Sequence, residues 1–246
     1  MKRFSALCVI AAAAVAATVS ARALAAPPQA TPTAQERVAA LKQSLQQSQA
    51  QIRQYEWIET TIISLKGEEK ARTQKRCYYG AGGKLEKLAM GDQPAATSAP
   101  SGRGGRGGRL KEKVVENKKD DMKEYMERAA ALIHRYVPPQ PEDIQRAKDA
   151  GKVKVAPAGP GRARLEFADY LQPGDRFALD VDAAANRLQG VTVATYLDKP
   201  EDAVTLDVQQ GALADGTGYS AQTTLDAASR KIRVVIQNSG YRPLAK

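Results

Sequence analysis

The sequence predicts an α+β fold in which a curved antiparallel β-sheet carries helices packed on its concave face. Two observations predict it. Residues 33–54 and 110–136 repeat apolar side chains at helical spacing, and residues 152–237 contain one alternating apolar run after another, separated by turn residues. The apolar faces of these elements need a common core, and one sheet curved around the helices supplies it.

The first 25 residues have the pattern of a secretory signal peptide. Two basic residues precede an apolar run, residues 4–19, and the small residues 23–25 form an Ala-x-Ala cleavage site. Cys8 lies inside the apolar run rather than at its end, so the sequence does not predict a lipid anchor. We therefore expect a mature chain that begins at Ala26, is periplasmic or secreted, and has no transmembrane segment.

The mature chain is expected to be a short tether followed by one domain. Residues 26–32 are rich in Pro, Ala and Thr, which is typical of a flexible segment. Residues 33–246 are enough for a single domain with a sizeable core. The first helix, residues 33–54, begins with a capping box in which the side chains of Thr33 and Glu36 satisfy backbone donors of the first turn.

A β-meander is predicted to follow the first helix. Residues 57–64 are mostly β-branched and aromatic, and two further strands are expected at residues 72–79 and 84–90. Polar, glycine-containing turns separate the three segments. Two or three antiparallel strands joined by short turns account for this pattern.

Residues 91–109 interrupt the pattern with a Gly- and Arg-rich loop. Arg-Gly-Gly repeats in intracellular proteins often bind RNA, but in an exported chain a solvated, disordered linker with a basic tip is favoured, so no nucleic-acid partner is expected. Without the signal peptide the chain has 34 Lys and Arg against 27 Asp and Glu, a net charge of +7. Such an excess favours anionic envelope surfaces, with solubility alone as the alternative, and the loop side chains that could contact such surfaces are Arg103, Arg106 and Arg109.

The central helix, residues 110–136, has an apolar stripe opposite a charged face. The charged face mixes acidic and basic residues, so packing on a protein core is favoured over binding to a membrane surface. Consecutive prolines at 138–139 end this helix, and a shorter helix begins at Pro141 and stops at Gly151. Seven strands are then expected, over residues 152–155, 162–167, 176–181, 190–197, 203–208, 218–225 and 231–237.

The cysteine and histidine counts exclude several kinds of chemistry. Only Cys77 remains after removal of the signal peptide, so no internal disulfide is possible, and we expect Cys77 to be buried, with an exposed thiol as the alternative. His134 is the single histidine, which excludes Ser-His-Asp catalysis and multi-histidine metal sites. Asp180 and Asp182 are the one notable carboxylate pair, and a solvated turn explains them better than catalysis. No enzyme activity, metal or cofactor is therefore expected.

Two stretches carry a resemblance to a known family. Residues 175–182 and their hairpin partner, residues 188–196, together with the order of elements, resemble the LolA-like periplasmic carriers of lipoproteins and lipids. That resemblance implies an incomplete barrel, plugged by helices, around an apolar cavity for acyl chains. Residues 77–80, 170–175 and 238–241 also resemble a group of uncharacterised exported bacterial proteins, from which no function follows.

Three classes of function compete on these observations. The favoured one is a non-catalytic envelope protein that binds a lipid or another hydrophobic ligand, such as an acyl chain or a lipoprotein. The second is a structural scaffold that contacts anionic polymers or lipids, and the third is a carboxylate enzyme. The residues expected to form a cavity wall, or else a dry core, are Trp57, Ile63, Phe177, Leu179, Val191, Val193 and Ile236.

Overall fold

The computed structural model describes residues 34–91 and 108–244. These residues contain three α-helices, α1 (Ala34–Gln51), α2 (Gly108–Ile133) and α3 (Pro141–Asp149). Ten strands form one antiparallel sheet: β1 (Tyr55–Leu65), β2 (Glu68–Tyr79), β3 (Leu85–Ala89), β4 (Val153–Pro157), β5 (Arg162–Ala168), β6 (Arg176–Asp182), β7 (Arg187–Tyr196), β8 (Ala203–Ala212), β9 (Gly218–Ala227) and β10 (Ile232–Pro243). The predicted signal peptide, the tether and most of the Gly/Arg loop lie outside the described residues.

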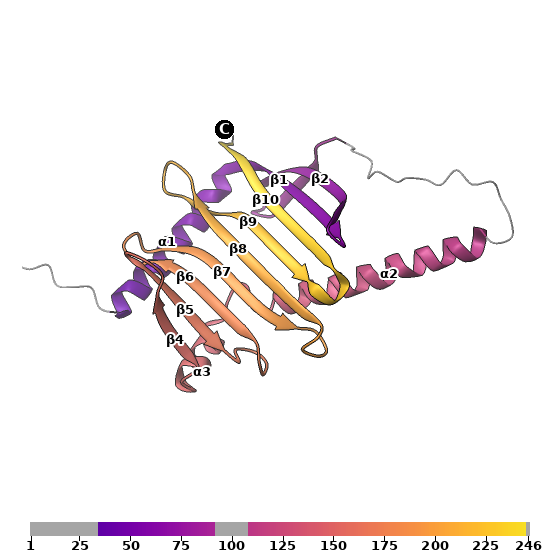
Figure 1. Ribbon diagram of the computed structural model, residues 1–246. Helices are drawn as coiled ribbons and strands as arrows, with labels where there is room; N and C mark the ends of the chain where they lie inside the picture. Colours follow the sequence, from indigo (N-terminus) through magenta and orange to yellow (C-terminus); the bar gives the residue numbers. More distant parts are fainter. Residues whose placement is uncertain (1–33, 92–107, 245–246) are drawn as a thin grey trace, which may run out of the picture. The chain divides into compact units, whose positions relative to one another are not determined.

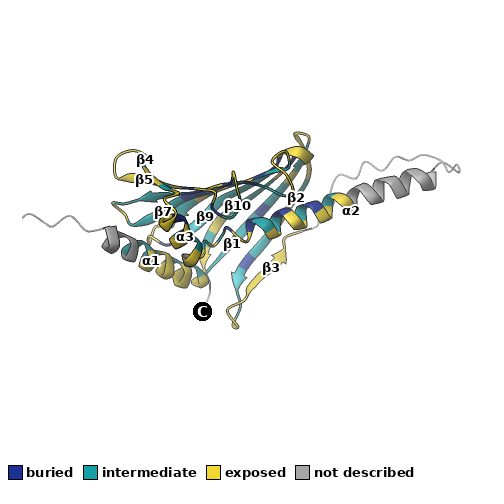
Figure 2. Ribbon diagram, turned by 90° about the horizontal axis from the view of Figure 1, so that it is seen from below, coloured by how far each residue is buried: buried dark blue, intermediate teal, exposed yellow. Residues whose placement is uncertain are grey.

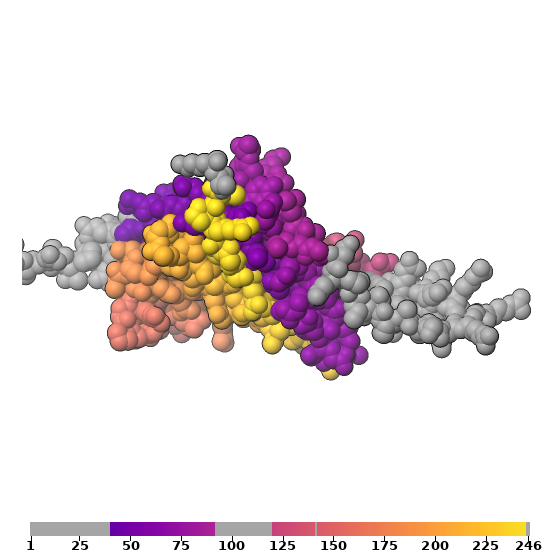
Figure 3. All heavy atoms as spheres, turned by 90° about the horizontal axis from the view of Figure 1, so that it is seen from above, coloured from indigo at the N-terminus to yellow at the C-terminus, as the bar shows by residue number. Residues whose placement is uncertain are grey.

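The sheet is open, with strand order β3-β2-β1-β10-β9-β8-β7-β6-β5-β4. The N-terminal meander, β1 to β3, is joined to the C-terminal strands because β1 pairs with β10; Ile63 lies opposite Val234 and Thr60 opposite Gln237. In Figure 3 the yellow C-terminal strand accordingly lies beside the indigo and purple N-terminal strands. This long-range pairing leaves β3 and β4 as the two edges of the sheet.

The first helix ends slightly earlier than its sequence pattern predicts. α1 stops at Gln51, and Ile52–Gln54 form one 3₁₀ turn. Tyr55 then has an extended backbone (φ −116°, ψ 149°), where the β-branched and aromatic segment of β1 begins. The short 3₁₀ turn brings the chain directly from the helix into the sheet.

The last strand is longer than expected. β10 runs to Pro243 rather than ending at Gln237. Gly240 has φ +64°, a value that favours glycine, and the pairing of β1 with β10 shifts register between Glu56 and Ile58 at the same level. This bulge interrupts the alternation of side chains and keeps Tyr241 beside Trp57, 5.6 Å between ring centroids.

All three helices lie on one face of the sheet (Figures 1 and 2). In α2, Tyr125, Ala129 and Ile133 recur every four residues and are buried, because this spacing places them on the same side of the helix. They join the main hydrophobic core with sheet residues such as Phe177 and Val193. Packing of the amphipathic helix on a protein core is therefore confirmed for its C-terminal half, from Met122 to Ile133.

A buried carboxylate fixes the loop between β5 and β6. Asp175 is 1% exposed, and its side-chain oxygens accept hydrogen bonds from the backbone N–H groups of Tyr170, Leu171 and Gln172 at 2.5, 3.0 and 2.9 Å. The hydroxyl of Tyr136 donates to the same carboxylate at 2.5 Å. Burial, and then this hydrogen bond, raise the pKa of Tyr136 well above its ordinary value. These hydrogen bonds connect the segment that follows α2 to the loop between β5 and β6.

The cysteine of β2 is buried, as its residue type predicts. Cys77 on β2 is 0% exposed, and its Sγ–H points to the carbonyl oxygen of Lys75 at 3.8 Å. Burial raises the pKa of the Cys77 thiol. The aspartate pair also has structural partners: Asp180 lies 3.6 Å from the Arg164 Nε, and Asp182 accepts hydrogen bonds from backbone N–H groups of the β6–β7 turn.

Candidate ligand-binding pocket

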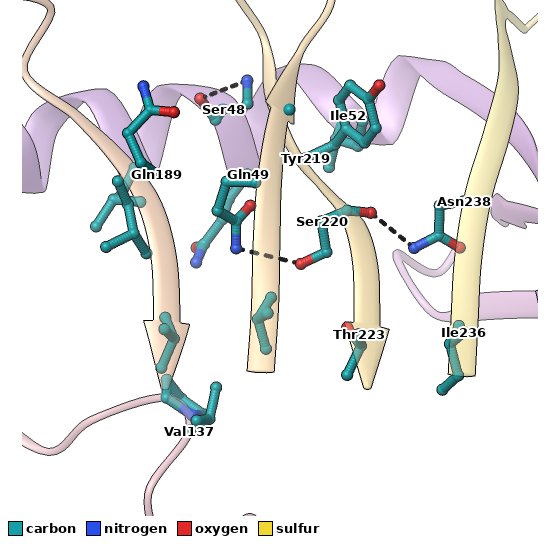
Figure 4. Close-up of a pocket in the computed structure, with 18 of the residues that line it drawn as sticks. Ser48, Gln49, Ile52, Val137, Gln189, Tyr219, Ser220, Thr223, Ile236 and Asn238 are labelled. Carbon is teal, nitrogen blue, oxygen red and sulfur yellow. Dashed lines mark hydrogen bonds between the residues drawn. The ribbon is translucent and has the colours of Figure 1, made fainter. Parts of the chain in front are cut away.

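A pocket of about 840 Å³ lies between α1, the segment Val137–Pro139 and the helix-bearing face of the sheet. Its lining comes from the described parts of α1 and α2 and from strands β1, β2 and β6 to β10. Figure 4 shows side chains of α1, β7, β9 and β10 pointing into the same space. The volume falls in the range of about 300 to 1,000 Å³ that is usual for small-molecule sites.

Aliphatic side chains form the floor of the pocket. Leu179, Val191, Val208, Thr223 and Ile236 are successive register partners on β6 to β10, and partners in antiparallel strands face the same side. They make one continuous row across five strands, apolar except at Thr223. The next row contributes three more apolar side chains, which are Leu206, Leu225 and Val234.

A row of uncharged polar side chains borders this floor. Gln210 Nε2 donates to Ser220 Oγ at 3.2 Å, and Asn238 Nδ2 donates to the Ser220 carbonyl oxygen at 2.9 Å (Figure 4). These three residues lie on the adjacent strands β8, β9 and β10 and line the pocket while remaining partly exposed. The pocket wall thus changes from aliphatic to hydrogen-bonding between one row of the sheet and the next. We call Gln210, Ser220 and Asn238 the polar row.

The first helix closes the pocket at this level. The backbone N–H of Gly218 donates to Ser48 Oγ at 3.0 Å, and the Thr217 hydroxyl donates to Gln51 Oε1 at 3.2 Å. A Cβ at Gly218 would lie only 3.1 Å from Ser48 Oγ, so glycine permits this close approach. Leu41 and Leu45 of α1 also line the pocket.

Four aromatic side chains gather at the end of the pocket beside β1 and β2. Trp57 packs against Tyr79 and Tyr241, at centroid distances of 5.9 and 5.6 Å, and Tyr241 lies 4.4 Å from Tyr219. Burial is the largest cause that raises the pKa of Tyr241. Gly211 lies beneath Tyr219, because a Cβ there would be 2.8 Å from the ring carbon Cζ. The aromatic cluster therefore narrows this end of the pocket.

The structure divides the predicted cavity residues into three groups. Trp57, Leu179, Val191 and Ile236 line the pocket. Phe177 and Val193, both 0% exposed, do not line it, because they pack in the solid core with Phe167 and Tyr136. Ile63 is 40% exposed and does not line it either.

The predicted anion contacts fall at the border of the described residues. Arg103 and Arg106 lie outside the described residues, and Arg109 is the second residue of α2. The helix therefore begins at Gly108, and the predicted loop boundary at residue 109 is corrected by two residues.

Sequence reasoning missed the polar part of the pocket. Ser48, Gln210 and Ser220 were not candidates, because single serines and glutamines carry no pattern that separates a pocket wall from a solvated face. Residues 238–241 stood out in the sequence, and the structure brings Asn238 and Tyr241 to the pocket.

The described residues contain no group of three or more His, Cys, Asp and Glu side chains that could hold a metal ion. Within the same part of the chain, no helix has both the length and the apolar composition needed to cross a membrane.

The sequence matches no family model and no curated protein. Its fold resembles the crystal structure of a DUF1329 family protein from Desulfovibrio piger, with 14% sequence identity and a TM-score of 0.39. The match covers 84% of this chain and 92% of that chain. A similarity this low supports no conclusion about function, and it does not confirm the resemblance to the LolA-like carriers.

Proposed function

We propose that this chain is an exported, non-catalytic protein of the cell envelope whose pocket binds one hydrophobic or amphipathic ligand. The observation that carries the proposal is the pocket of about 840 Å³ over an aliphatic floor. Leu179, Leu225 and Ile236 in that floor are only partly buried, although they face the helices. An acyl chain placed over them would remove apolar surface from water that the folded protein alone leaves accessible.

We also propose that the sheet is curved. The helix-bearing face is taken to be the concave side, with α1 as the outer wall of the pocket. Only two side-chain hydrogen bonds, from Gly218 to Ser48 and from Thr217 to Gln51, join the described part of α1 to β9 and the turn before it. Because few hydrogen bonds hold α1, the helix can move away from the sheet and let a ligand enter.

The test is titration with saturated fatty acids of increasing length, followed by displacement of a fluorescent apolar probe. Affinity should rise with each added methylene, by up to about 0.8 kcal/mol, until the pocket is full. Ile236→Trp should place an indole in the space above the floor and weaken binding, while Gln237→Trp, the next residue and on the opposite face, should leave it unchanged. Affinity that does not depend on chain length, or binding that Ile236→Trp does not weaken, would favour a scaffold that contacts anionic polymers instead.

A further inference from the structure

Unpaired polar atoms concentrate in the pocket. Among the described residues, five buried side-chain nitrogen and oxygen atoms have no hydrogen-bond partner, and three of them line the pocket: Trp57 Nε1, Arg187 Nε and Asn238 Oδ1. Folded proteins pair nearly all of their buried polar atoms with their own groups, with water or with a ligand. Of these three side chains only Arg187 is charged, and hydrogen bonds to a charged group are the strongest that a ligand could add.

Arg187 has no acidic partner among the described residues. It is the half-buried first residue of β7, and it forms no ion pair with Asp182 or with another described carboxylate. Asp182 is its register partner on β6, but the Asp182 carboxylate accepts hydrogen bonds from the backbone N–H groups of Ala184 and Ala185 at 3.0 and 2.9 Å. The described residues therefore leave the guanidinium without an anion, and burying an unpaired charge is costly.

A β-bulge brings three consecutive residues of β7 to the pocket. The register of β6 and β7 shifts between Asp180 and Val181, which gives β7 an extra residue at this level. Arg187, Leu188 and Gln189 all line the pocket, although a regular strand would alternate them between its two faces. Gln189, drawn in Figure 4, adds amide N–H groups that can donate to the same anion as the guanidinium.

The charge of the pocket matches a ligand with one negative charge. Arg187 is the only Lys, Arg, Asp or Glu among the described lining residues, and the polar row is uncharged. A carboxylate carries one negative charge, and its two oxygens fit the fork of a guanidinium. A phosphate monoester carries about 1.5 to 2 negative charges at neutral pH, which one cation does not balance. His134 also lines the pocket but is exposed, so water and salt screen any charge that it carries.

We propose that the ligand is a long-chain carboxylate, such as a free fatty acid, whose carboxylate accepts hydrogen bonds from the guanidinium of Arg187. Val191 lies further along β7, so the hydrocarbon chain continues from the guanidinium onto the aliphatic floor between Leu179 and Ile236. This inference rests on the proposed function and adds the head group and the residue that binds it.

The experiment compares three ligands with the same acyl chain at pH 8, where the fatty acid is ionised: myristate, monomyristoylglycerol and myristoyl lysophosphatidate. Each displaces a fluorescent apolar probe below the concentration at which it forms micelles, so a difference in affinity reports the head group. Myristate should bind at least about tenfold more tightly than the neutral ester, because only a charged head group forms charge-assisted hydrogen bonds with Arg187. It should also bind more tightly than the lysophosphatidate, whose second charge has no partner.

Two matched variants test the role of Arg187. Arg187→Gln removes the charge and should weaken myristate binding by at least about tenfold, while the affinity for the ester stays unchanged. Arg176→Gln removes the same charge from an exposed position on the opposite face of β6 and should change neither affinity. Without ligand, Arg187→Gln should need at least as much urea to unfold as the unmodified protein, because it removes a buried donor that has no partner among the described residues.

Each other result overturns a defined part of the account. Equal affinities for myristate and the ester, or an equal loss of both in Arg187→Gln, would refute a head group at Arg187 while keeping the pocket. Tighter binding of the lysophosphatidate that Arg187→Gln abolishes would keep the anion and refute the carboxylate. A marked loss of stability in Arg187→Gln without ligand would assign Arg187 to the fold instead of the ligand. Failure of all three ligands to bind would refute the proposed function itself.

Discussion

The Ser48 hydroxyl accepts a hydrogen bond from the backbone N–H of Gly218 at 3.0 Å, and this contact joins α1 to β9 beside the pocket. Ser48→Ala removes the acceptor and leaves the N–H without a partner. We expect a loss of about 1 kcal/mol of folding free energy and faster hydrogen exchange in α1. Gln47→Ala, at an exposed position of the same helix, is the control. Unchanged exchange in α1 would mean that this hydrogen bond does not hold the helix.

The buried carboxylate of Asp175 should be the most sensitive polar position in the core. Asp175→Ala leaves three backbone N–H groups and the Tyr136 hydroxyl without an acceptor, so we expect a loss of about 3 to 5 kcal/mol in chemical denaturation. Asp198→Ala breaks the exposed ion pair with Arg128 and should cost less than about 1 kcal/mol. Similar losses for the two variants would contradict the network described for Asp175.

Gly211 should control the width of the aromatic end of the pocket. A Cβ at this position would lie 2.8 Å from Tyr219 Cζ, so in Gly211→Ala the tyrosine ring must move. The ring is the free end of a side chain, and we expect stability to change by less than about 1 kcal/mol while ligand affinity changes more strongly. In a Tyr219→Ala background, Gly211→Ala should have no further effect on affinity. If Gly211→Ala still changes the ligand affinity in that background, Gly211 does not act through the Tyr219 ring.

The Cys77 thiol should react with iodoacetamide only after unfolding, because it is 0% exposed. Cys77→Ser should cost about 1 to 3 kcal/mol, since a hydroxyl would replace sulfur in an apolar site. Rapid labelling of the native protein would contradict this burial.

The same thiol should contribute to the pH dependence of stability. Burial raises the pKa of Cys77 in the folded state, so above the unfolded value of about 8.5 the unfolded chain loses the proton first. This contribution to stability is present below that pH and declines as the pH rises through the folded pKa. In Cys77→Ala the decline should be smaller, as measured by urea denaturation between pH 7 and pH 10.

The elements could be predicted from the sequence because their patterns are local. The alternation of Val204, Leu206 and Val208 gives a strand with one buried face whatever its neighbours are, and all three side chains are buried. The pairing of β1 with β10 joins residues about 170 positions apart, and no local pattern reports it. The extension of β10 past Gly240 was missed because the bulge breaks the alternation.

The pocket was predicted only in part because neighbouring positions on one strand face have different surroundings. Phe177 and Leu179 share a face of β6 and are equally apolar. Phe177 lies in the row with Phe167 and Val193, under the ring of Tyr170, whereas Leu179 lies in the row that the pocket leaves uncovered. Cross-strand register and the positions of the helices decide between core and cavity, and neither can be read from alternation.

Native mass spectrometry of the protein purified from its own cell envelope tests the central claim most directly. The unmodified protein and Gln237→Trp should each carry one non-covalent lipid adduct, and Ile236→Trp should carry less of it, because its indole occupies part of the space above the pocket floor. Absence of an adduct from all three proteins, or an undiminished amount of adduct on Ile236→Trp, would contradict a ligand in this pocket.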